Sequence, residues 1–184
     1  MTDEQMISAC QAMDRTAQRI LYERMAPKLY ATCRRYLRHQ YEIEDVLAES
    51  FFIIFTRVHQ LSEVKAFEGW ARRVCVHQCL AYLRKKTSFS IHLDEASEHQ
   101  LPDTGDEMPL ESEDLMRLLL QLPDGCRTVF NLHIIEGYSH KEIAGMLGIS
   151  EGTSKSQLNF GRKKLQELVR QFYYQTYQRH EQSR

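Results

Sequence analysis

The sequence lacks any apolar run close to the roughly 20 residues that a membrane-spanning helix needs. The stretch FFIIF at 51–55 is far too short, and the N-terminal MTDEQMISACQAMDR is polar, without the apolar core of a signal peptide. The five cysteines are an odd number without the spacing of a disulfide framework, which favours a reducing compartment. We therefore expect a soluble, cytoplasmic protein, whose 184 residues allow one ordinary domain or two small ones.

Motifs of common catalytic chemistry are also absent. The sequence has no Walker loop, no glycine-rich dinucleotide turn and no GxSxG nucleophile motif. Cys75, His77 and Cys79 suggest zinc by their types. On a helix, however, His77 points away from the two cysteines, and no second ligand pair follows at zinc-finger spacing. We expect no catalytic residue, no metal, no cofactor and no small-molecule substrate, so an enzyme is disfavoured.

Basic residues are missing from one segment only. Residues 87–114 carry nine acidic residues and no lysine or arginine, whereas residues 1–86 and 115–184 each have a net charge of +4. The acidic segment also contains two prolines and a glycine, which is typical of a linker. We predict two domains, 1–87 and 114–184, joined by a linker over 88–113, and the two basic blocks suggest a polyanionic partner.

Strict period-2 alternation and hairpin-turn dipeptides are lacking, so both blocks are expected to be helical. Apolar residues recur at three- and four-residue steps over 44–58, and a further helix is predicted over about 70–86. Upstream, Pro27 is expected to interrupt a helix or to start one. The predicted fold class is all-α: two small helical domains joined by an acidic, flexible linker.

The most specific pattern is a helix-turn-helix in the C-terminal block. Ser139 with Glu142 three residues later is a capping box, which marks a helix start. Gly148 suits a left-handed helix end, and Ser150 suits the N-cap of a second helix. This pattern predicts a winged-helix-like domain of the DNA-binding kind, with the second helix in the major groove. An ordinary helical hairpin with a solvated polar face is the disfavoured alternative.

A second pattern combines cations with aromatic residues near the end of the first block. Such a combination suits stacking on unpaired bases beside a phosphate backbone. Taken alone, however, the pattern fits better a helix that packs in the core and points its basic side chains to solvent. The residues concerned are Phe67, Trp70, Arg72, Arg73, Tyr82, Arg84, Lys85, Lys86 and Phe89.

These segments occur together in an order that resembles a known family. The first block contains LYERMAPKLYATCRRYL, EIEDVLAESF and FEGWARRVCVHQCLAYLRKK, and the second contains LPDGCRTVFNLHIIEGYSHKEIAGMLGIS. Over nearly the whole chain they resemble an RNA polymerase sigma factor of the sigma-70 family, extracytoplasmic-function (ECF) group. The stretch SEGTSKSQL is similar to the versions common in Bacteroidetes.

The resemblance implies a role for each part. The first domain (sigma domain 2) would bind core RNA polymerase at the clamp helices of its largest subunit, and the beta flap would be a further contact. The second domain (sigma domain 4) would recognise the −35 element of promoter DNA. The linker would thread the polymerase, and an anti-sigma protein, often membrane-bound, would hold the factor inactive.

The resemblance also implies site residues. Those for core polymerase are Glu44, Asp45 and Glu49. Those for recognising and melting the −10 element are Phe67, Trp70, Arg72, Arg73, His77, Tyr82, Arg84, Lys85 and Lys86. Those for the −35 element are His133, Thr153, Lys155, Ser156, Asn159 and Phe160, with Arg162 and Lys163 as phosphate contacts suggested by charge.

Three departures from the family pattern affect these expectations. His77 stands where an asparagine is usual, Ala48 replaces a common glutamine, and Asn159-Phe160-Gly161 replaces a more basic run, which weakens phosphate contact. The runner-up function is a stand-alone helix-turn-helix regulator, which would dimerise on a palindrome and need no acidic docking face. A DNA recombinase is the third class, but it would need a nucleophile that we do not find.

Overall fold

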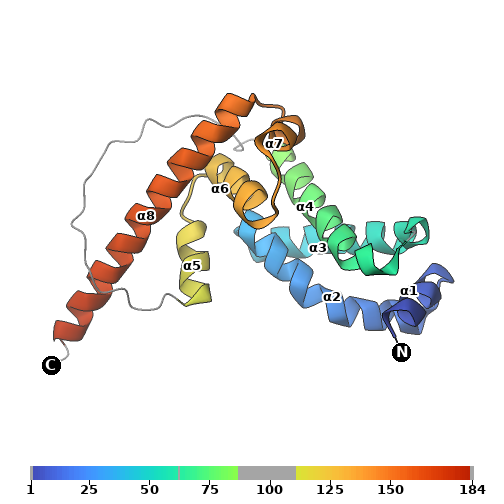
Figure 1. Cartoon of the computed structure of the whole chain (residues 1–184). Helices are drawn as coiled ribbons and strands as arrows, with labels where there is room; N and C mark the ends of the chain where they lie inside the picture. Colours follow the sequence, from blue (N-terminus) through green and yellow to red (C-terminus); the bar gives the residue numbers. More distant parts are fainter. Residues whose placement is uncertain (1, 62, 87–110, 183–184) are drawn as a thin grey trace. The chain divides into compact units, whose positions relative to one another are not determined.

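The computed structural model describes residues 2–61, 63–86 and 111–182, and these form helices and turns without a β-strand (Figure 1). The predicted all-α fold is therefore confirmed. The chain divides into two compact units, Met1–Thr87 and Ser88–Arg184. Most of the expected linker lies outside the described residues. None of the described helices is both long and apolar enough to cross a membrane.

The first unit packs three long helices around one core, with a short helix ahead of them. They are α1 (Asp3–Gln11), α2 (Arg15–Tyr36), α3 (Gln40–Arg57) and α4 (Phe67–Lys85), with the 3-10 turns η1 (Val58–Gln60) and η2 (Val64–Ala66) between α3 and α4. The core draws side chains from each helix, among them Ile7, Leu21, Leu29, Ile54 and Leu80.

Helix α2 continues through Pro27, so the expected interruption or helix start at this residue is wrong. Proline lacks a backbone N–H, and the helix therefore forgoes one hydrogen bond to the carbonyl four residues earlier. The ring of Pro27 is exposed, whereas Met25 and Leu29 on either side are buried. Burial of the flanking apolar side chains outweighs the local cost of the proline.

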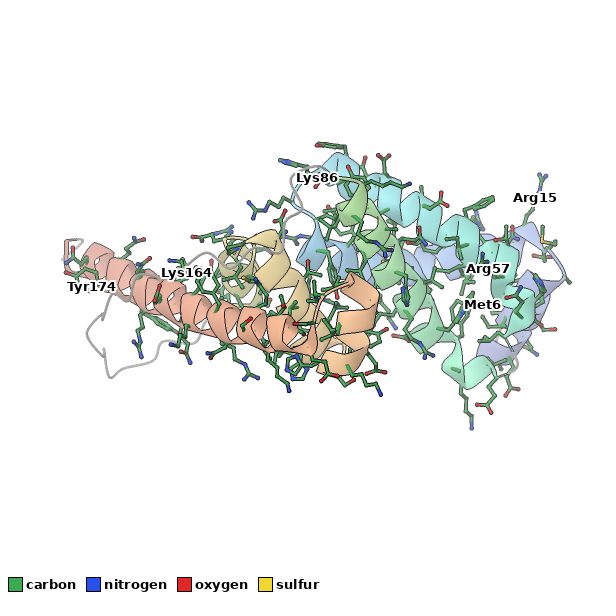
Figure 2. The ribbon with its side chains drawn as sticks, turned by 90° about the horizontal axis from the view of Figure 1, so that it is seen from above. Met6, Arg15, Arg57, Lys86, Lys164 and Tyr174 are labelled. Carbon is green, nitrogen blue, oxygen red and sulfur yellow. The ribbon has the colours of Figure 1, made fainter. Side chains whose placement is uncertain are left out.

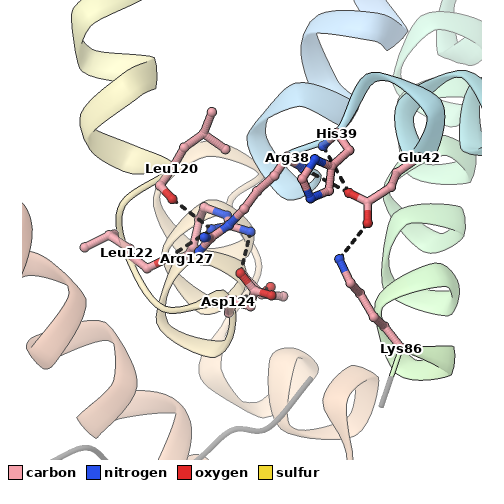
Figure 3. Close-up of polar contacts among 9 residues, drawn as sticks. Arg38, His39, Glu42, Lys86, Leu120, Leu122, Asp124 and Arg127 are labelled. Carbon is pink, nitrogen blue, oxygen red and sulfur yellow. Dashed lines mark hydrogen bonds and ion pairs between the residues drawn. The ribbon is translucent and has the colours of Figure 1, made fainter. Parts of the chain in front are cut away.

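The start of α3 is fixed by a buried carboxylate, Glu42 (Figure 3). Its side chain is 2% exposed and accepts hydrogen bonds from the backbone N–H groups of Arg38 (3.2 Å) and His39 (3.1 Å). Lys86 Nζ, just beyond the end of α4, forms an ion pair with it at 2.6 Å (Figure 3). Burial alone raises the pKa of Glu42, but these hydrogen bonds and the lysine charge outweigh it and lower the pKa.

The second unit consists of four α-helices and a π-helical turn among the described residues. They are α5 (Ser112–Leu119), α6 (Asp124–Phe130), η3 (Asn131–Ile135), α7 (His140–Leu147) and α8 (Glu151–Gln182). Its core includes Leu119, Leu122, Val129, Leu132 and Ile143. Figure 2 labels Lys164 and Tyr174 on the part of α8 that continues beyond the helix-turn-helix.

A buried arginine fixes the turn between α5 and α6. Arg127 is 1% exposed, and its guanidinium donates to the carbonyl oxygens of Leu122 (3.0 Å) and Leu120 (3.4 Å) (Figure 3). It also pairs with Asp124 Oδ1 at 2.8 Å. A buried charge is tolerated only when it is paired and hydrogen-bonded, so these partners make Arg127 a structural residue.

Candidate nucleic-acid interface

Local capping defines the helix-turn-helix, as the sequence predicts. At the start of α7, Ser139 Oγ accepts from the Glu142 N–H (3.3 Å), and the Glu142 carboxylate accepts from the Ser139 N–H (2.8 Å). Gly148 ends α7 with φ +69°, and its N–H donates to the Ala144 carbonyl at 2.9 Å. Ser150 Oγ accepts from the Thr153 N–H at 2.9 Å and caps α8. The capping box, the left-handed glycine and the second N-cap are confirmed.

Two histidines fix α7 against its neighbours. His140 Nδ1 lies 2.9 Å from Oγ of Ser154, a fully buried residue of α8. The His133 ring stacks on His140 with centroids 4.4 Å apart, and His133 Nδ1 lies 2.8 Å from the Tyr138 carbonyl. Burial and the charges of His133 and Lys155 lower the pKa of His140. The recognition helix α8 is thus tied to a rigid support.

Helices α6 and α8 approach each other closely at Gly161. A Cβ at this position would lie 3.5 Å from both the Cβ and the carbonyl oxygen of Cys126. Four residues earlier, Gln157 is buried, and its Oε1 accepts a hydrogen bond from Cys126 Sγ at 2.7 Å. Packing therefore explains one of the three residues, Asn159-Phe160-Gly161, that replace the more basic run of the family pattern. A long basic side chain in place of Gly161 would separate these two helices.

The side of α8 away from the core carries exposed polar residues, and we call four of them the α8 outer face. Its members are Lys155, Asn159, Arg162 and Lys163. The residues opposite them are buried: Ser154, Gln157, Leu158 and Gly161. The structure thus brings together half of the residues expected to contact −35 DNA, on the second helix of the motif.

The other expected −35 residues are half-buried. Ser156 Oγ donates to the Thr153 carbonyl at 2.9 Å, so both residues take part in the first turn of α8. Phe160 lies on α8 between its exposed and buried sides, and His133 lies on η3. Thr153 and Ser156 therefore belong to the turn from which the α8 outer face begins.

Helix α4 also has one face that carries expected DNA-binding residues, the α4 outer face. At about 100° per residue, Trp70, Arg73, His77 and Arg84 point within roughly 60° of one another. The three polar residues are exposed, and Trp70 is half-buried. This face lies opposite the core residues of α4, which include Cys75, Cys79 and Leu83.

The remaining expected −10 residues do not share this face. Phe67 is 6% exposed, and its ring lies in the core with its centroid 6.0 Å from that of Trp70. Lys86 pairs with Glu42, as described above. Tyr82 is half-buried; Arg72 and Lys85 are exposed on other sides of the helix. Phe89 lies outside the residues that the structure describes.

A cavity of about 360 Å³ lies beside the start of α4. Residues of α1, α2, η2 and α4 line it, and they include Ile7, Arg24, Lys65, Phe67 and Glu68. Its wall therefore combines apolar side chains with two cations and two carboxylates, since Glu4 also lines it. An apolar lining with a few polar groups suits a planar, partly polar ligand.

Helix α3 exposes three acidic residues together with two aromatic rings. Glu44, Asp45 and Glu49 are all exposed. Tyr41 and Phe52 are 60% and 64% exposed, and at about 100° per residue they point to the same side as Asp45 and Glu49. We call Tyr41, Asp45, Glu49 and Phe52 the α3 outer face.

The two aromatic residues were not among the expected site residues. The helical period could have identified them. Tyr41 and Phe52 fall outside the three- and four-residue spacing of the buried positions of α3, which include Ile43, Val46 and Ile54. Exposed aromatic residues beside charged ones are typical of protein–protein interfaces. The α3 outer face therefore has the composition of a docking surface for another protein.

Both units match models of one protein family. Residues 21–89 match the model for Sigma-70 region 2, and residues 112–165 match the model for Sigma-70, region 4. The first match contains the α3 and α4 outer faces, and the second contains the helix-turn-helix.

Three relatives have similar sequences. The ECF RNA polymerase sigma factor SigE of Mycolicibacterium smegmatis is 28% identical, over 81% of this chain and 60% of the relative. SigW of Bacillus subtilis, also an ECF sigma factor, is 26% identical over 78% of this chain and 83% of the relative. The ECF sigma-E factor of Haemophilus influenzae is 25% identical over 92% of this chain and 96% of the relative.

Proposed function

The chain belongs to the sigma-70 family and is an ECF RNA polymerase sigma factor, and from this premise we propose how its three outer faces divide the work of initiation. The α8 outer face contacts the −35 duplex, the α4 outer face captures the opened −10 element, and the α3 outer face binds core polymerase. The catalysis belongs to the polymerase, and the factor acts in the cytoplasm.

The capped helix-turn-helix is the observation that carries this proposal. The hydrogen bonds of His140 with Ser154 and of Cys126 with Gln157 hold α8 on its support. A rigid recognition helix can present Lys155 and Asn159 to base edges in the major groove. Arg162 and Lys163, further along the same face, suit phosphate contacts that fix register.

The α4 outer face has the chemistry that captures unpaired bases. Trp70 offers a ring for stacking, His77 a ring that both stacks and hydrogen-bonds, and Arg73 and Arg84 offer charges for the backbone. The cavity beside Lys65 and Phe67 is a candidate site for one base turned out of the duplex. Filling such a site offsets the unstacking cost of about a few kcal/mol.

The α3 outer face suits a basic, partly apolar partner helix, such as the clamp helices of the polymerase's largest subunit. Asp45 and Glu49 supply the charge that steers association, and Tyr41 and Phe52 supply apolar area at the centre of a contact. Glu42 differs from these acids, because it is buried and paired with Lys86. It belongs to the fold and not to the docking surface.

Charge reversal of α3 tests the polymerase contact. The double variant Asp45→Lys, Glu49→Lys is expected to lower affinity for purified core polymerase at least about 100-fold, because like charges across an interface cost several kcal/mol. Tyr41→Ala with Phe52→Ala is expected to weaken binding without changing charge. Glu23→Lys is the control, since this exposed carboxylate lies on α2. Wild-type affinity in both α3 variants would contradict the docking role.

Substitution in α8 tests the −35 contact. Lys155→Ala is expected to lower transcription from a −35-dependent promoter roughly tenfold, the effect of losing one base contact of about 1–3 kcal/mol. Core binding is expected to stay unchanged. Lys164→Ala is the matched control, because Lys164 is half-buried and pairs with Glu167 at 3.3 Å. Equal initiation by wild type and Lys155→Ala would refute the assignment.

We also propose that an anti-sigma protein, linked to the membrane, masks the α3 and α8 outer faces until it is released. Deleting the regulator gene beside that of the factor is then expected to raise transcription of the target genes. Unchanged transcription would count against such an inhibitor. The stand-alone regulator is the weaker alternative, because it does not explain the α3 outer face or the region 2 match over residues 21–89.

A further inference from the structure

Three cysteine thiols converge in the core of the first unit. Cys33 lies on α2, and Cys75 and Cys79 lie one turn apart on α4; all three side chains are fully buried. The Sγ atoms of Cys33 and Cys75 are 3.3 Å apart, and all three Sγ atoms lie within 4.8 Å of one another. We propose that Cys33, Cys75 and Cys79 form a site for one soft metal ion of the copper(I) class, held by three thiolates.

The sulfur positions fit the bond lengths of such an ion. Because no two of the three sulfurs are more than 4.8 Å apart, a point equidistant from them lies at most about 2.6 Å from each, near the metal–sulfur distance of about 2.3 Å known for zinc thiolates. Only small movements of the side chains are needed to reach that length. Helices α2 and α4 already bring the three ligand atoms together.

The ligand set favours an ion that accepts three sulfurs. Thiolates select soft ions such as copper(I) and zinc. Structural zinc almost always takes four ligands, and no fourth histidine, cysteine, aspartate or glutamate joins this cluster among the described residues. Copper(I) accepts three thiolates, so the cluster is complete for copper(I) and incomplete for zinc.

Metal binding requires the three thiols to lose their protons. On binding, the three thiols release three protons to solvent and keep their electron pairs for the metal, which does not change oxidation state.

A disulfide between Cys33 and Cys75 is the rival chemistry. It would use only two of the three sulfurs, and they would have to approach from 3.3 Å to about 2.05 Å. It would also require an oxidant, whereas the cluster can ligate a soft ion in a reducing compartment. The expectation of no metal site weighed Cys75, His77 and Cys79 and missed Cys33, which is distant in the sequence.

Titration of the reduced full-length protein with copper(I) under anaerobic conditions tests the proposal, both on the folded protein and during refolding from urea. We expect one tightly held ion per chain, with the ultraviolet absorption of a copper–thiolate bond. Cys33→Ala and Cys75→Ala are expected to lose this ion. Cys10→Ala and Cys126→Ala are the controls, because those cysteines lie outside the cluster, and they are expected to retain it.

Circular dichroism of each metal-free variant shows whether it folds, and Cys79→Ala gives a second test of the cluster if Cys75→Ala does not fold. Absence of binding in the folded and refolding arms would overturn the proposal, as would copper retained by folded Cys33→Ala protein. Zinc bound more tightly than copper(I) through the same cysteines would overturn the three-thiolate assignment. A Cys33–Cys75 disulfide in protein purified without oxidant would show the rival chemistry instead.

Discussion

The ion pair between Glu42 and Lys86 is expected to stabilise the first unit measurably. Lys86→Met keeps most of the apolar stem and removes the ammonium that lies 2.6 Å from a carboxylate with 2% exposure. Removing one partner of a buried pair costs about 3–5 kcal/mol. Because the Lys86 side chain is 35% exposed, water can replace part of its effect, and we expect a loss of about 2 kcal/mol.

The pH dependence of this loss of stability shows whether the ion pair with the ionised Glu42 carboxylate causes it. The pKa of Glu42 is lowered in the folded protein, so the pair's contribution is complete above the ordinary glutamate pKa of about 4.3. It disappears as the pH falls through the lowered, folded-state value. The difference in unfolding free energy between wild type and Lys86→Met is therefore expected to persist from pH 7 down to about pH 5 and to shrink at lower pH.

Urea denaturation of the full chain measures this difference through the fluorescence of Trp70, the single tryptophan, which lies in the first unit. Lys85→Met is the matched control: its side chain is exposed, and we expect a change within about 0.5 kcal/mol. Equal stabilities of wild type and Lys86→Met at pH 7 would refute the reasoning. So would a loss that stays the same when the carboxylate is protonated.

Three further predictions concern the second unit. Gly161→Ala is expected to stabilise it by about 0.5–1 kcal/mol in thermal melts, because the new Cβ makes an ordinary 3.5 Å contact with Cys126 and alanine favours a helix; a lower melting temperature would contradict this. Gly148→Ala is expected to destabilise it by about 1–2 kcal/mol in the same melts, since φ there is +69°, and an unchanged melting temperature would count against the strain. Arg162→Ala is expected to reduce the salt slope of promoter binding by the polymerase complex by about 1, and an identical slope would exclude a phosphate contact.

Features set by neighbouring residues could be predicted from the sequence. Ser139 and Glu142 are three residues apart, and each satisfies the other's backbone N–H, so the start of α7 depends on a four-residue segment. Gly148 and Ser150 likewise act within one turn of their own positions. The helix-turn-helix and the α8 outer face follow from these signals together with the helical period.

Features set by residues far apart in the chain could not be predicted from the sequence. Cys33 meets Cys75 across 42 positions, and Glu42 meets Lys86 across 44, so no local pattern shows either pair. The burial of Phe67 depends in the same way on how α4 packs against the rest of the unit. At Pro27 a local signal was present but misleading. Proline disfavours the interior of a helix, and burial of the apolar side chains on both sides of it outweighed this preference.

Transcription in vitro is the most direct test of the central claim. Purified core polymerase would be incubated with fragmented genomic DNA of the source organism, with this protein, without it, and with the Asp45→Lys, Glu49→Lys variant. A sigma factor is expected to produce specific start sites that share two sequence boxes at fixed spacing, and the variant is expected to produce none. No new start sites with the wild-type protein, together with its footprints on free duplex DNA, would contradict the account and indicate a stand-alone regulator.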